Sequence, residues 1–160
     1  KVVDEKGKPR IMYRGSSGES AEQYGGVGSR NLLFVTGKKE FAEKYASQYP
    51  NGKVYDVYVK ANHPIDIGGS DYPLWKQFKQ ETDAPSYASV KTDEGMAVAW
   101  THERPFRQWL DEQTIKYDGI YFGENDGSRS LALKNIVQIK SVTGNRGTFD
   151  ITNPDIMKGY

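Results

Sequence analysis

Cysteine is absent from this chain of 160 residues, and histidine occurs only twice. Without thiols the protein cannot form disulfides, carry out thiolate catalysis or build a cysteine-based zinc site, and this absence says nothing about compartment. The two histidines, His63 and His102, are far apart in the sequence and lack the spacing of a helical metal-binding pair. We therefore expect no metal, and we interpret both histidines as structural or surface residues.

Long apolar runs and an excess of one charge are also missing. No apolar run approaches the roughly 20 residues that span a bilayer, and the first ten residues, KVVDEKGKPR, are too charged for a signal peptide. We expect no membrane association. The 22 Lys and Arg residues and 21 Asp and Glu residues give a formal net charge of +1, which does not indicate a large nucleic-acid-binding surface. We expect either a monomeric domain or part of a longer chain. The lysine at the first position favours the longer chain.

The length predicts one domain, residues 1–160, with a single sizeable core. Residues 38–49 place Ala42, Tyr45 and Ala46 at helical spacing, which predicts an amphipathic helix. Three segments have the apolar, aromatic and β-branched content of strands. They are residues 10–14 (RIMYR), 31–36 (NLLFVT) and 54–61 (VYDVYVKA).

The middle of the sequence is helical in character, and strands return after it. Predicted helices cover residues 71–80, 92–103 and 104–115, and predicted strands cover 119–122, 130–133 and 137–142. In the last helix Phe106, Trp109 and Leu110 recur on one side. Strands, a helical insertion and strands again predict an α+β domain. Residues 143–160 are mostly turn formers and are predicted to be a surface extension.

The segment MYRGSS, residues 12–17, ends a short strand with an arginine, a glycine and two serines. Arg14 could simply close a surface ion pair, which contributes little to stability. Gly15 has no side chain and so lets the backbone approach closely. The glycine-rich segment 15–28 lacks both the P-loop pattern GxxxxGK[ST] and a dinucleotide fingerprint. We interpret it as a plain loop.

Three parts of the sequence share a pattern. Residues 13–16 read YRGS at the end of the first strand. Phe34 and Tyr45 stand eleven positions apart, one on a predicted strand and the other on the following helix. Residues 117–122 (YDGIYF) and 137–156 follow at the end of the chain. Together these parts resemble the ADP-ribosyltransferase fold, in the branch of diphtheria toxin and poly(ADP-ribose) polymerases, and most closely the domains of phage polyvalent proteins.

The resemblance has identifiable departures. That branch carries histidine where this chain has Arg14, although the cholera-toxin-like branch carries arginine there, often in a YRG context. It places tyrosines at the positions of Phe34 and Tyr45, so that Phe34 keeps the ring and lacks the hydroxyl. The resemblance implies split antiparallel β-sheets with flanking helices and a helical insertion. It also implies cleavage of NAD, as a co-substrate, and transfer of ADP-ribose to a macromolecular acceptor, protein or nucleic acid, by a phage or toxin effector delivered into the cytoplasm of a host or target cell.

The resemblance assigns roles to particular residues. Phe34 and Tyr45 would position the nicotinamide ring, and Arg14 would bind a phosphate or ribose oxygen of NAD and act in catalysis with Tyr45. The remaining NAD-binding positions are Tyr13, Gly15, Ser16 and Thr36.

The position of the family's catalytic glutamate is also altered. Alignment on the Gln-Ile-Lys-Ser segment puts Ser130 there, preceded by Arg129. Glu124 or Asp126 in the segment just upstream could supply the missing carboxylate. Three alternatives stay open: an NAD glycohydrolase with water as acceptor, a catalytically weak or inactive module that binds NAD or ADP-ribose, and an interaction domain of a larger polyprotein.

Overall fold

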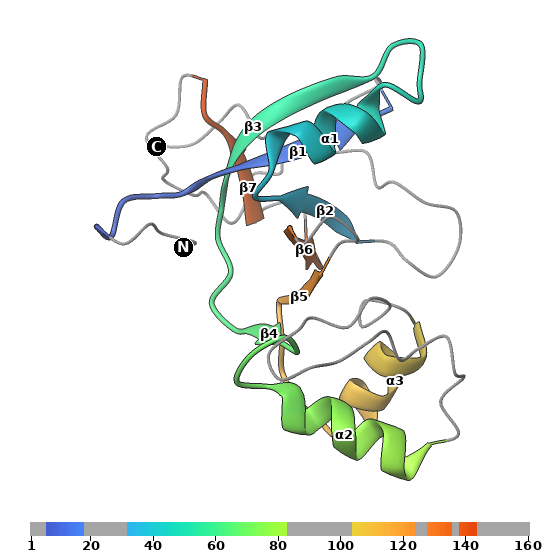
Figure 1. Cartoon of the computed structure of the whole chain (residues 1–160). Helices are drawn as coiled ribbons and strands as arrows, with labels where there is room; N and C mark the ends of the chain where they lie inside the picture. The colour runs from blue at the N-terminus through green and yellow to red at the C-terminus, as the bar shows by residue number, and fades with distance from the viewer. Residues whose placement is uncertain (1–5, 18–31, 83–103, 124–127, 136–137, 144–160) are drawn as a thin grey trace.

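The structure is a computed structural model, and it describes residues 6–17, 32–82, 104–123, 128–135 and 138–143. Within these residues the chain forms three helices and a seven-stranded sheet that is mixed but mostly antiparallel (Figure 1). The prediction of an α+β fold is confirmed. The elements in chain order are β1 (Ile11–Ser16), β2 (Leu33–Thr36), α1 (Lys39–Ala46), β3 (Lys53–Val59), β4 (Pro64–Asp66), α2 (Tyr72–Glu81), α3 (Arg104–Glu112), β5 (Gly119–Gly123), β6 (Arg129–Leu133) and β7 (Ile139–Ser141).

The strand order brings distant segments together. The order is β4-β5-β6-β2-β1-β3-β7, and β2 pairs with β6 along its whole length. All six residues of β1 pair with β3, whereas the register between β1 and β2 holds one pair, Tyr13 with Thr36. Within the described strands β1 and β2 therefore separate beyond Tyr13. The last three residues of β1 lie at this separation.

Helix α1 covers one face of the sheet over β1 and β3 (Figure 1). Its Ala42 and Ala46 are buried, as the helical spacing predicted. The backbone N–H of Lys38 donates a hydrogen bond to Thr36 Oγ1 at 3.2 Å, which links the end of β2 to the start of the helix. In the turn after α1, a Cβ on Gly52 would lie 1.7 Å from the Ala46 carbonyl oxygen, so only glycine fits there.

The opposite face of the sheet carries the main apolar core. Met12 of β1 lies directly opposite Val57 of β3, and both belong to this core with Val59. Val57 and Val59 share this face, as the alternation of a strand requires. Leucine and isoleucine side chains from the neighbouring strands complete the cluster: Leu33, Leu131, Leu133 and Ile139.

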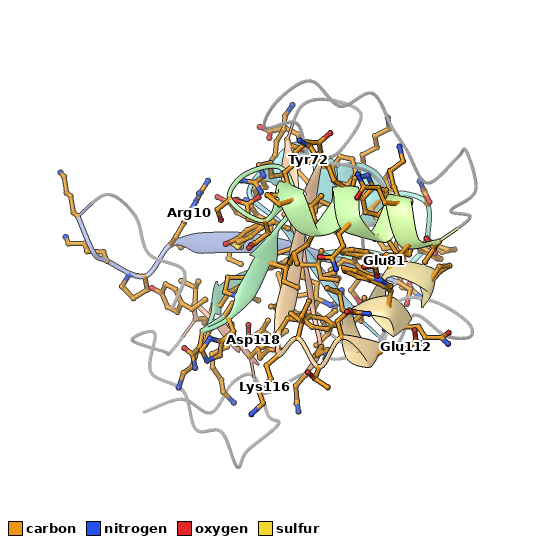
Figure 2. All side chains as sticks on the ribbon, turned by 90° about the horizontal axis from the view of Figure 1, so that it is seen from below. Arg10, Tyr72, Glu81, Glu112, Lys116 and Asp118 are labelled. Carbon is orange, nitrogen blue, oxygen red and sulfur yellow. The ribbon has the colours of Figure 1, made fainter. Side chains whose placement is uncertain are left out.

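A second core lies where α2 and α3 pack against β4 and β5. Phe106, Trp109 and Leu110 are all buried in it, as their spacing predicted. Trp109 Nε1 donates a hydrogen bond of 2.9 Å to the Glu81 carboxylate, which joins the two helices. Figure 2 labels Glu81 at the end of α2. None of the helices in the described part of the chain has the length and apolar content needed to cross a membrane.

Strand β4 is the main departure from the sequence prediction. Its three residues are too few to show a period, and they pair in parallel with β5, starting at Pro64 and Gly119. The Asp118 carboxylate holds this start in place by accepting the backbone N–H groups of Asn62 at 2.7 Å and His63 at 3.0 Å. His63 is exposed. The predicted helix 92–103, which contains His102, and the segment 144–160 lie outside the described residues.

Candidate active site at the end of strand β1

Arg14 is a buried cation rather than a surface residue. Only 3% of its surface is exposed. Its Nη1 donates a hydrogen bond of 3.0 Å to the carbonyl oxygen of Phe34. This bond bridges β1 and β2 at the place where their backbone pairing has ended. Burying a guanidinium is costly unless its N–H groups are bonded, so Arg14 fixes the distance between the separating strands.

Gly15 is required by space. A Cβ at this position would lie 2.6 Å from the carbonyl oxygen of Ala42 and 3.0 Å from Cδ1 of Tyr45. The first distance is shorter than real Cβ contacts, and the atom it meets belongs to the backbone of α1. The helix therefore packs directly on the β1 backbone, and the ring of Tyr45 lies next to Gly15.

The sheet register shows which candidate residues share a face. Neighbouring residues of a strand point to opposite faces, and directly paired residues point to the same face. Gly15 faces α1, so Tyr13 does as well, together with its partner Thr36. Phe34 alternates with Val35 on β2 and shares the face of Thr36. The same rule places Ser130, the partner of Thr36 on β6, on the α1 face.

Arg14 and Ser16 lie on the other face. Arg14 alternates with Gly15 and shares the side of Met12, which belongs to the main core. Ser16 is 2% exposed. The two faces are nevertheless coupled, because the charge of Arg14 lowers the pKa of Tyr45.

The aromatic pair named from the sequence has separate aromatic neighbours. Tyr45 is half-buried, and its ring packs at a tilt against Tyr49 with centroids 5.6 Å apart. The hydrogen bond between the two hydroxyls raises the pKa of Tyr45, burial and the Tyr49 charge raise it further, and the charge of Arg14 lowers it in part. Phe34 meets Phe122 edge-on at 5.9 Å. Both Phe34 and Tyr45 therefore lie on the α1 side of the sheet.

Ser130 occupies a buried position in the middle of the sheet. It is 2% exposed and is paired with Thr36 on one side and Phe122 on the other. Glu124 and Asp126, the two acids expected to act beside it, lie outside the described residues.

The sequence relationships decide the family. A family model described as ADP-ribosyltransferase in polyvalent proteins matches residues 4–149. The chain belongs to this family. Membership in the ADP-ribosyltransferase family confirms the resemblance drawn from residues 13–16, the Phe34 and Tyr45 pair and the closing segment, and it implies NAD as substrate. No curated protein and no solved structure matches the chain significantly.

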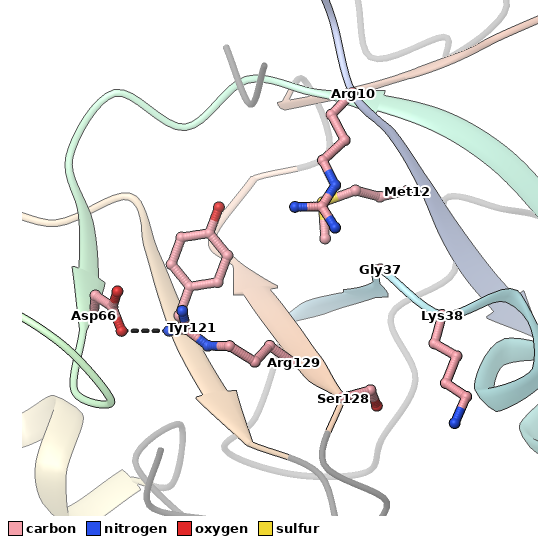
Figure 3. A pocket seen from close by; sticks show the side chains of 8 residues that line it. All are labelled: Arg10, Met12, Gly37, Lys38, Asp66, Tyr121, Ser128 and Arg129. Atoms are coloured by element: carbon pink, nitrogen blue, oxygen red, sulfur yellow. Dashed lines mark hydrogen bonds and ion pairs between the residues drawn. The ribbon is translucent and has the colours of Figure 1, made fainter. Parts of the chain in front are cut away.

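This ADP-ribosyltransferase family member also has a pocket that the sequence did not predict. The cavity has a volume of about 500 Å³ and is lined by side chains of β1, β4, β5 and β6 and by the residues between β2 and α1 (Figure 3). Arg10, Tyr121 and Arg129 line it, together with Asp66, which forms an ion pair with Arg129. Segments from five parts of the chain meet here, so no local sequence pattern predicts the pocket.

The described residues lack the ligand arrangement of a metal site. Across the described ranges, no group of three or more His, Cys, Asp or Glu side chains is arranged to hold a metal ion.

Proposed function

We propose that this protein transfers ADP-ribose from NAD to a macromolecular acceptor and binds nicotinamide on the α1 face of the sheet, beside Gly15 and Tyr45. The observation that carries the proposal is the close packing of α1 on Gly15, with Tyr45 Cδ1 3.0 Å from where a Cβ would stand. The two most specific parts of the family pattern thereby meet in space. Tyr45 is half-buried, so part of its ring remains exposed to stack on a pyridine ring.

The reaction breaks the bond between ribose C1′ and the nicotinamide nitrogen. The electron pair of that bond returns to the pyridinium ring, which leaves as neutral nicotinamide, while positive charge builds on the ribose. A nucleophilic oxygen or nitrogen of the acceptor forms the new bond to C1′ and releases its proton to a base. The protein contributes by positioning the leaving ring and the ribose before this step.

Arg14 serves this site as a positioning residue and as a fixed charge. Its bond to the Phe34 carbonyl holds β2 at a set distance from β1. Its charge, which already acts on Tyr45, favours the anionic diphosphate of NAD on the same part of the molecule. We assign contacts to the rest of NAD to Tyr13, Ser16 and Thr36. Thr36 Oγ1 also accepts the N–H of Lys38 in the structure.

We assign to Glu124 or Asp126 the carboxylate that accepts a hydrogen bond from the ribose 2′-hydroxyl. Ser130 has no charge and stands where the family pattern has glutamate. A well-placed charge in a dry site contributes about 3–4 kcal/mol to transition-state stabilisation, a factor of roughly 100 to 1000 in rate. A carboxylate from the neighbouring segment would recover part of that factor.

The uncharged Ser130 at the glutamate position favours two weaker activities. If no carboxylate reaches the ribose, the site retains NAD binding and cleaves slowly or not at all. Water as acceptor would make the protein an NAD glycohydrolase. In each case the chain would act as a module of a phage polyvalent protein, and we propose delivery into a host or target cell for the transferring form.

Radiolabelled NAD separates these functions. The wild-type protein is incubated with NAD labelled in the adenylate part and with a cell lysate, and both the label on macromolecules and the free nicotinamide are measured. Transfer gives label on protein or nucleic acid. Hydrolysis gives nicotinamide with no labelled acceptor, and binding alone gives a higher melting temperature with NAD. Absence of all three signals would refute the proposed function.

A further inference from the structure

The pocket in Figure 3 lies on the face of the sheet opposite α1. Met12 of β1 lies on the side that Arg14 shares, Arg10 directly precedes this strand, and Tyr121 pairs with Leu131 of the main core. The nicotinamide site proposed beside Gly15 lies on the other face. At its rim the pocket uses Lys38, which follows Thr36 closely, and Ser128, which precedes Ser130. The described lining residues of the pocket are thus different from the residues of the proposed active site.

Positive charge dominates the pocket. Among the residues that the structure describes, three cationic side chains, Arg10, Lys38 and Arg129, line it together with one carboxylate, Asp66. The carboxylate is held by Arg129, whose guanidinium also lies over the Tyr121 ring at 5.0 Å from its centroid. Asp66 is fixed in turn by Asp71, whose carboxylate accepts the Asp66 backbone N–H at 2.7 Å. Arg129 is therefore neutralised and oriented by Asp66, which leaves the charge of Arg10 without a described carboxylate beside it.

Arg10 supplies much of the remaining positive charge. Among the residues that the structure describes, no carboxylate forms an ion pair with Arg10, and none accepts a hydrogen bond from its guanidinium. Its guanidinium points into the pocket (Figure 3), and its Nη2 would be only 3.3 Å from a Cβ at Gly37. Burial raises the pKa of Tyr121, while the charges of Arg129 and Arg10 lower it in part, so the phenol stays a neutral hydrogen-bond donor between two guanidiniums.

We propose that this pocket binds a phosphate or diphosphate group of the acceptor substrate, with Arg10 as its principal ligand. Guanidinium groups bind phosphate oxygens through paired N–H donors, and Tyr121 adds a hydroxyl. A cavity of about 500 Å³ is the size of a nucleotide-scale ligand. The acceptor is thus a phosphorylated molecule whose phosphate rests on one face of the sheet while its nucleophile reaches the ribose. The anion site does not depend on the proposed function, whereas its assignment to the acceptor rests on that function.

Calorimetric titration with inorganic pyrophosphate tests the anion site. We expect the wild-type protein to bind it and Arg10→Gln to bind it about tenfold more weakly, because one charge-assisted contact is lost. Asp66→Asn should bind severalfold more tightly, since it removes the only described carboxylate of the pocket. The matched control is Lys116→Gln, which removes one exposed charge on a different side of the molecule from Arg10 (Figure 2) and should bind within twofold of wild type. No binding, or equal weakening in Arg10→Gln and Lys116→Gln, would overturn the site.

The source of the phosphate is decided by repeating the titration with saturating NAD. If the pocket holds the acceptor, the pyrophosphate affinity is unchanged and Arg10→Gln leaves NAD affinity within twofold. Competition between pyrophosphate and NAD, with weaker NAD binding by Arg10→Gln, would show that the pocket holds the diphosphate of NAD and would overturn the acceptor assignment. Pyrophosphate binding that depends on Arg10 in a protein that binds no NAD would refute the proposed function and the acceptor assignment, and would leave the anion site in place.

Discussion

Replacement of Gly15 by alanine tests the contact on which the proposed site depends. The new Cβ would stand 2.6 Å from the Ala42 carbonyl oxygen and 3.0 Å from Tyr45 Cδ1. Neither the strand nor the helix backbone can yield cheaply, so α1 must shift away by several tenths of an ångström. Overpacking of this kind costs about 1–3 kcal/mol, and alanine recovers about 0.4–1 kcal/mol by restricting the unfolded chain. We expect a net loss of about 1–2 kcal/mol, or a melting temperature roughly 2–8 °C lower.

The shift should also reduce NAD affinity, because it moves the Tyr45 ring away from the β1 backbone. We expect at least a tenfold rise in the dissociation constant for NAD, measured by calorimetry well below the melting temperature. Gly7→Ala is the control. Gly7 has a φ of 74°, which strains alanine, but among the described residues beyond its chain neighbours no atom lies within 4 Å of its Cβ position. It should lose some stability and keep NAD affinity. Equal NAD affinity for Gly15→Ala and wild type would refute the placement of nicotinamide beside α1.

Substitutions at four further positions test the roles of Arg14, Tyr45, Ser130 and Tyr117. Arg14→Met leaves a carbonyl of Phe34 without its guanidinium donor, so the free energy of unfolding in urea should fall by about 1–3 kcal/mol; the pKa of Tyr45, followed by NMR of labelled tyrosine, should rise because a lowering charge is gone. Tyr45→Phe keeps the ring and should bind NAD within threefold of wild type, whereas Tyr45→Ala should lose tenfold or more; equal values for the two would exclude stacking. Ser130→Glu should release nicotinamide at least tenfold faster than Ser130→Gln, which has the same size without the charge, and a slower Glu variant would mean that another acid already acts there. Burial raises the pKa of Tyr117 to about 12, so the stability that its neutral phenol contributes is complete below about pH 10 and is lost between about pH 10 and 12. In urea unfolding, Tyr117→Phe should lose less stability than wild type over that pH range. An equal loss of stability in both proteins would show that other groups cause the pH dependence.

Much of the fold could be predicted because local patterns carry it. The buried alanines of α1 and the buried Phe106, Trp109 and Leu110 of α3 follow the helical period, and Val57 and Val59 follow the strand period. Strand β4 could not be predicted, since three residues show no period and its partner β5 lies more than 50 positions further along the chain.

The candidate site was predicted less completely, because its geometry depends on register. The sequence grouped Arg14, Gly15 and Tyr45 by motif, and the structure brings Gly15 against Tyr45. It places Arg14 on the opposite face, as strand alternation requires of neighbouring residues. The pocket around Arg10 arises from five chain segments that meet only in the folded sheet, so the sequence carried no local signal for it.

A crystal structure with a non-cleavable NAD analogue tests the central claim most directly. The account predicts a nicotinamide ring on the α1 face, stacked on Tyr45 with ring centroids about 4.5–7 Å apart and next to the Gly15 backbone. A nicotinamide ring bound in the pocket of Arg10 and Tyr121, or anywhere else away from Tyr45, would contradict it.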